Sequence, residues 1–148
     1  MNTTIGEKDV STTVLLNASR EQVFEAWIDP DQLAQWWGPR GFRNTFEVFE
    51  PKPDGDWKFV MHGPDGTDYD NHNVFREVRP NERIVIEHLH FPPFKLTGSF
   101  EDEGGRTRLT FHQEFASKEV FDQVKSYCIE GNQQNLERLQ DLLAKLHA

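Results

Sequence analysis

The chain has 148 residues, which suits one folded domain spanning residues 1–148 with a single core. It carries 16 Lys and Arg against 25 Asp and Glu, a net charge of −9, so we expect neither nucleic acid nor a membrane surface as a partner. One cysteine excludes an internal disulfide, and the first ten residues do not resemble a signal peptide, so the expected location is the cytoplasm.

The first predicted elements are a strand and two short helices. Residues 10–17 are rich in β-branched side chains and predict the strand, and Ser19 with Gln22 has the pattern of a helix N-cap with its capping box. Heavy apolar side chains then recur at helical spacing, with an interruption at Asp29-Pro30 and an end at Gly38-Pro39. Two helices this short cannot cover so much aromatic surface alone, so they require a sheet to pack against.

The middle of the chain alternates with a period of two and predicts six antiparallel strands. Turns rich in Gly and Pro separate the alternating segments. The expected strands are residues 42–48, 57–62, 69–78, 84–90, 96–101 and 107–115. Because no helical period lies between them, strands that follow one another in the chain should be neighbours in the sheet.

From Ser117 onward the pattern is helical again, with one apolar stripe. Asn132 and Asn135 project into the middle of this stripe, where apolar side chains are expected. An unpaired buried polar group costs roughly 1 to 3 kcal/mol. Either the helix breaks at Gly131, or the two amides face a cavity that contains water or a ligand. In the second case the ends of the helix pack and its middle lines a site.

Four segments resemble a known family. They read W-I-D-P-D-Q-L-A-Q-W-W-G-P at residues 27–39, G-D-W-K-F-V-M-H-G-P-D-G at 55–66, N-E-R-I-V-I at 81–86 and L-E-R-L at 136–139. With the order of elements, they make the chain resemble the SRPBCC or START-like helix-grip superfamily. Within it, the chain is similar to the subgroup named after the C-terminal domain of the activator of the heat-shock protein 90 ATPase.

The resemblance implies an α+β helix-grip fold. A curved antiparallel sheet of about seven strands would wrap around a long C-terminal helix, with two short helices after the first strand. An apolar cavity would lie between the sheet and that helix. Many relatives have a Gly-Trp pair where this chain has Gly131-Asn132, so we expect a roomier or wetter cavity at that position.

The predicted function is binding of a small apolar or aromatic molecule in this cavity, without a cofactor. The 12 Phe and 4 Trp suit such a site, because rings line pockets as well as cores. The expected wall is Trp37, Phe46, Trp57, Phe59, Met61 and Phe111. His88 and His90, two apart on a strand, point the same way and would orient the ligand with Asn132 and Asn135. Cys128 lies on the apolar stripe and is expected to be an inert buried thiol at the site.

Two other functions stay open. His88 or His90 could move a proton in a cyclase or hydrolase that acts on polyketide-like substrates. The chain could also be a cochaperone-like module, for which an acidic surface suits a basic protein partner. The two imidazoles could share a metal ion, but spacing supplies no third ligand, so no metal site is predicted. A homodimer formed through a sheet edge or the helical layer also stays open.

Overall fold

The computed structural model describes residues 1–147 and contains one antiparallel sheet with three helices packed on it. The strands are β1 (Asn2–Ile5), β2 (Asp9–Leu16), β3 (Arg43–Phe49), β4 (Asp56–His62), β5 (Asp68–Arg79), β6 (Arg83–His88), β7 (Phe94–Glu103) and β8 (Arg106–Phe115). The helices are α1 (Arg20–Ile28), α2 (Pro30–Trp36) and α3 (Lys118–Leu146). Within residues 1–147, no helix has both the length and the apolar character needed to cross a bilayer.

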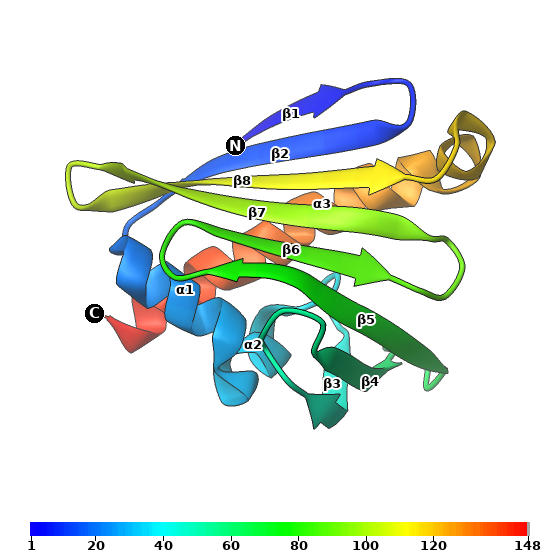
Figure 1. Ribbon diagram of the computed structural model, residues 1–148, viewed down its shortest axis with the longest axis horizontal. Coiled ribbons are helices and arrows are strands. Elements are labelled where there is room, and N and C mark those ends of the chain that lie inside the picture. The colour runs from blue at the N-terminus through cyan, green and yellow to red at the C-terminus, as the bar shows by residue number, and fades with distance from the viewer. Residues whose placement is uncertain (148) are drawn as a thin grey trace.

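The sheet has eight strands in the order β1-β2-β8-β7-β6-β5-β4-β3. In Figure 1, α3 passes behind its central strands, and α3 packs against β2 and β8. α1 contacts β7 and β8, whereas α2 lies beside β3 and α3. The predicted α+β helix-grip fold is therefore confirmed, with eight strands in place of about seven.

The additional strand is β1, which pairs antiparallel with β2 from Asn2 opposite Thr13 to Ile5 opposite Val10. It is short, and three of its four residues are exposed. An edge strand of this kind is held by backbone hydrogen bonds, so it shows no alternation of apolar and polar side chains. The sequence pattern therefore gave no sign of it.

The capping box predicted at the start of α1 is present. Ser19 Oγ accepts from the backbone N–H of Gln22 at 3.2 Å, and Gln22 Oε1 accepts from the backbone N–H of Ser19 at 3.0 Å. Trp36 at the end of α2 donates from its indole Nε1 to the carbonyl oxygen of Ala26 in α1 at 2.9 Å. The two short helices are thus tied to each other and bury their tryptophans against the sheet.

α3 continues without a break through Gly131, so of the two alternatives for Asn132 and Asn135 the helix break is excluded. Near its start, Phe121 and Val124 pack in a small core cluster, and in its second half Leu136 and Leu139 belong to the main core. The segment between these clusters is less buried, with Cys128 and Ile129 only partly buried against the smaller cluster. Both ends of the helix are anchored, and its middle is free to line a site.

Candidate ligand-binding site

The loop after α2, residues 37–42, is fastened to α3 by hydrogen bonds. Arg138 donates from Nη1 and Nη2 to five backbone carbonyl oxygens at 2.8 to 3.1 Å, those of Gln35, Trp37, Gly38, Pro39 and Phe42. Asn135 Oδ1 accepts from the backbone N–H of Gly38. Gly38 has φ +94°, a left-handed conformation that favours glycine. The loop therefore forms a fixed wall opposite the sheet.

Two adjoining hollows lie between this loop, the sheet and the middle of α3. The larger one, here called the hollow, has a volume of about 810 Å³. The smaller one, here called the recess, has a volume of about 160 Å³. They share six lining residues, which are Trp37, Pro39, Phe94, Gln113, Tyr127 and Cys128. The shared lining residues place the recess directly beside the hollow.

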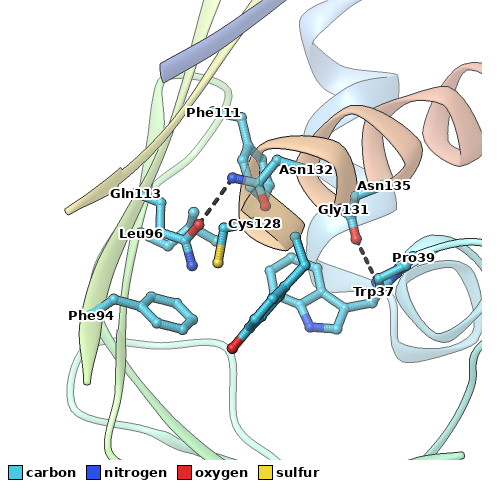
Figure 2. A pocket seen from close by; sticks show the side chains of 12 residues that line it. Trp37, Pro39, Phe94, Leu96, Phe111, Gln113, Cys128, Gly131, Asn132 and Asn135 are labelled. Carbon is cyan, nitrogen blue, oxygen red and sulfur yellow. Dashed lines mark hydrogen bonds between the residues drawn. The ribbon is translucent and has the colours of Figure 1, made fainter. Parts of the chain in front are cut away.

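Apolar and polar side chains alternate around the recess (Figure 2). Leu96 of β7 lies opposite Gln113 of β8, and both line the recess together with Phe111 of β8. Asn132 of α3 donates from Nδ2 to Gln113 Oε1 at 2.9 Å. Gly131 also borders the recess, so the middle of α3 presents small groups where a larger side chain would project into this space.

His88 lines the hollow as a buried, neutral imidazole. It donates from Nδ1 to Asn73 Oδ1 at 2.7 Å, since an amide oxygen can only accept, and its ring stacks on Phe94 with centroids 4.6 Å apart. Burial, with smaller contributions from His90 and His72, lowers the pKa of His88 to about 4. At neutral pH its Nε2 therefore carries a lone pair that can accept a hydrogen bond.

His90 lies beyond the end of β6, because the strand stops at His88 instead of continuing to residue 90 as predicted. Its exposed ring donates from Nδ1 to the carbonyl oxygen of Asp70 at 3.0 Å and lies 6.1 Å from the ring of His88. Both histidines line the hollow. Within the described part of the chain, no three His, Cys, Asp or Glu side chains are grouped so that they could hold a metal ion.

The profile of the family described as Activator of Hsp90 ATPase homolog 1-like protein matches residues 17–144. The chain belongs to this family. The predicted resemblance is thus confirmed, and none of the curated proteins matches the chain.

Solved structures share the fold of this family member. A protein from Arthrobacter aurescens is 24% identical with a TM-score of 0.90, and the match covers 97% of this chain and 91% of that one. A protein from Mycobacterium smegmatis is 24% identical with a TM-score of 0.87 and 99% coverage of both chains. The AHSA1 protein from Silicibacter pomeroyi is 21% identical with a TM-score of 0.77, covering 94% of this chain and 99% of that one. At these identities the likeness extends to the fold alone.

Most of the residues predicted for the site border one of the two spaces. Trp37 and Cys128 line both. The hollow also includes Phe59, Met61, His88 and His90. The recess also includes Phe111, Asn132 and Asn135. Burial raises the pKa of the Cys128 thiol to about 11, so it stays protonated, although the side chain is half-buried and not fully enclosed as expected.

Phe46 and Trp57 do not line either space, which corrects their predicted place in the wall. Trp57 is fully buried and stacks on Phe59 with ring centroids 4.4 Å apart. Phe46 meets the edge of Trp57 at 5.4 Å. Alternation identified the face of the strand on which these rings lie, but it does not distinguish a ring that borders the space from a ring packed beside it. Trp57 thus supports the wall from within the core, and the partly buried Phe46 packs against that core.

Sequence reasoning missed several residues at the mouth and in the recess. The mouth carries exposed aromatic rings, among them Tyr69, Phe91 and Tyr127. Phe91 lies between the predicted strand 84–90 and two prolines, so no periodic pattern indicated that its ring would border a site. Gln113 could have been found, since it is a polar residue on the face of β8 that also carries Phe111 and is itself buried.

Proposed function

We propose that this family member binds a small, largely apolar or aromatic molecule in the hollow and the recess. The observation that carries the proposal is the pair of adjoining spaces, of about 810 Å³ and about 160 Å³, between the sheet, the loop 37–42 and the middle of α3. Ligand pockets in proteins commonly measure roughly 300 to 1,000 Å³ and combine apolar walls with a few polar groups. The aromatic wall and the small polar set of this site fit that description.

Burial of apolar surface supplies most of the affinity in this proposal. A bicyclic aromatic ligand that buries on the order of 200 Å² gains about 5 kcal/mol at 25 cal/mol per Å², before the cost of association. Trp37 and Phe94 border both spaces and provide aromatic surface for contact with such a ligand. Affinity therefore depends on ring area, whereas orientation depends on the polar groups.

His88 favours binding over catalysis. A general base works best when its pKa lies near the operating pH, whereas the His88 pKa is lowered to about 4. A neutral imidazole with a free Nε2 is instead suited to accept a hydrogen bond from a hydroxyl or N–H group of a ligand. The cyclase or hydrolase alternative requires a stronger proton acceptor than this histidine.

The proposal is tested by native mass spectrometry of freshly purified protein and by titration with a panel of naphthalene compounds followed by tryptophan fluorescence. Asn132→Leu is expected to keep the fold and change the order of affinities, because it replaces an amide bordering the recess with an apolar group. Gln123→Leu is the control, since Gln123 is exposed on the same helix.

The absence of saturable binding by the wild-type protein, together with no co-purifying molecule, would contradict the proposed function. If the wild type and Asn132→Leu have identical affinities for the whole panel, Asn132 does not contact the ligand. That result would leave the proposed role of the other lining residues unchanged.

A further inference from the structure

Two amide side chains that line the recess use only part of their hydrogen-bonding capacity. Asn132 Nδ2 is bonded to Gln113 Oε1, which leaves Asn132 Oδ1 and Gln113 Nε2. Within residues 1–147 these two atoms have no hydrogen-bond partner, and neither is sealed off from solvent as the amide nitrogen of Asn135 is. In Figure 2 both lie on the side of the amide pair where the sulfur of Cys128 lies, and Cys128 lines both spaces. The recess therefore presents a free acceptor beside a free donor.

This combination does not depend on how the two amides are oriented. An amide oxygen only accepts and an amide nitrogen only donates, so one bond between two amides always joins the nitrogen of one to the oxygen of the other. If both amides were rotated by half a turn, Asn132 and Gln113 would exchange roles, and one acceptor and one donor would still be free. Because a single bond of 2.9 Å joins the amides, one small ligand can contact both free atoms.

The position of the amide pair makes these free atoms useful for recognition. Gln113 is 6% exposed and Asn132 is half-buried, so water reaches their amides poorly. A hydrogen bond to a ligand contributes more in such surroundings than on an open surface. Leu96 and Phe111, which line the same space, offer no polar side-chain atom in its place. Gln113 also lines the hollow, so a ligand that occupies the hollow can reach the pair with one edge.

The charges around the site indicate that this edge of the ligand is neutral. No Lys or Arg is among the described residues that line the hollow or the recess, so a buried carboxylate would have no counter-charge. Asp68 and Asp70 line only the hollow, and the described lining of the recess contains no acidic side chain to pair with an ammonium group. The lowered pKa of His88 keeps its imidazole uncharged at neutral pH. An uncharged group that both donates and accepts fits the recess.

We propose that the ligand carries a lactam, whose N–H donates to the free acceptor of the Asn132–Gln113 pair and whose carbonyl oxygen accepts from the free donor. A lactam is uncharged at neutral pH and holds its N–H and C=O on one edge of a ring. This inference rests on the proposed function and narrows it to a ligand class. The lactam edge lies in the recess, and the aromatic ring fused to it extends past Trp37 and Phe94 into the hollow.

Three bicyclic compounds of similar outline test the inference: carbostyril, which is a lactam, methylnaphthalene, which has neither polar group, and naphthoate, which is charged. Dissociation constants are measured for the wild type, Asn132→Leu, Gln113→Met and the control Gln123→Leu, which is exposed on α3. The dissociation constant of carbostyril relative to that of methylnaphthalene should rise roughly tenfold in each site variant, the size expected for one lost hydrogen bond, and stay unchanged in the control. Naphthoate should bind the wild type at least about tenfold more weakly than carbostyril.

A second measurement uses only the wild type, so it holds even if the buried substitution Gln113→Met prevents folding. The N–H proton of bound carbostyril should give nuclear Overhauser contacts to the side-chain amide protons of Asn132 and Gln113. An N–H proton without these contacts, an unchanged ratio of dissociation constants in the site variants, or tightest binding by naphthoate would overturn the inference while leaving the proposed function standing. If none of the three compounds binds, the proposed function itself is contradicted.

Discussion

The aromatic block around Trp57 and the site around Cys128 are built on the same sheet from similar rings, yet one is solid and the other is hollow. Trp57 is fully enclosed, with Phe59 and Phe75 stacked on it at 4.4 and 6.0 Å. Around Cys128, Phe94 and Trp37 instead border a space whose α3 side is formed by Tyr127, Cys128, Gly131, Asn132 and Asn135. Aromatic content is therefore a poor guide to a cavity, and what faces the rings decides whether space remains.

α3 shows the same contrast along one helix. Its second half inserts Leu136 and Leu139 into the main core, where both are fully buried. Its middle presents Gly131 and Asn132 to the recess, with the polar side chain of Asn132 bonded to the sheet. The leucines supply packing energy, and the small residues between the packed clusters leave room. Substitutions in the two regions should therefore differ in stability and in binding.

The largest expected effect is a loss of stability when the aromatic block around Trp57 is disrupted. Trp57→Ala should lower the free energy of unfolding by about 3 to 5 kcal/mol, because it removes a fully buried ring from between its stacking partners. Tyr127→Ala, at a residue that lines the hollow and is 60% exposed, should cost less than about 1 kcal/mol. Urea denaturation of both variants measures the difference, and equal losses would contradict the distinction between the regions.

The next effect is pH dependence from His88. Its pKa is lowered from 6.5 to about 4 in the folded protein, so between these values the unfolded chain binds more protons. The associated stability is therefore present above about pH 6.5 and is lost as the pH falls through about 4, a total of roughly 3 kcal/mol.

Urea denaturation across this pH range should show that loss in the wild type and a much smaller one in His88→Gln. His90→Gln is the control, because His90 is exposed and should leave most of the pH dependence in place. A wild-type profile that matches His88→Gln would mean that the imidazole is not desolvated in the site.

A smaller effect separates two glycines, one that packs against the buried Trp27 and one that borders the recess. A Cβ atom at Gly98 would lie 2.9 Å from Cη2 of Trp27, so Gly98→Ala should cost about 1 to 3 kcal/mol through overpacking. A Cβ atom at Gly131 would meet Pro39 Cγ at 3.5 Å, an ordinary contact, so Gly131→Ala should stabilise the helix by about 0.5 to 1 kcal/mol. Thermal unfolding measures whether each variant is less or more stable than the wild type. A Gly98→Ala variant that is more stable would contradict the tight packing of Trp27.

The sequence predicted the elements well wherever a repeating pattern or a side-chain cap determines local structure. Both short helices and the capping box at Ser19 followed from helical spacing and capping chemistry. The hairpin between β7 and β8 also followed from alternation, although its turn is tighter than expected, at Gly104-Gly105 with φ of +66° and +90°. β1 had no such pattern, because backbone pairing forms it.

The site was harder to predict. How deeply a side chain is buried, and which partner an amide side chain hydrogen-bonds, both depend on contacts between segments that are distant in the sequence. Helical geometry correctly placed Asn132 and Asn135 toward the interior, but it could not show that Asn135 Oδ1 bonds the backbone of Gly38. Alternation correctly placed Trp57 on the inward face of its strand. It could not show that Trp57 is fully buried and does not line the site. In both cases the missing information is which side chain of another element occupies the neighbouring volume.

The most direct test of the contrast between solid block and hollow is intermolecular nuclear Overhauser spectroscopy with a bound naphthalene ligand. We predict contacts from ligand protons to the side chains of Phe94 and Cys128, which line both spaces, and none to Trp57, which is enclosed. Contacts confined to surface residues away from α3, or none from a ligand that saturates, would contradict the account.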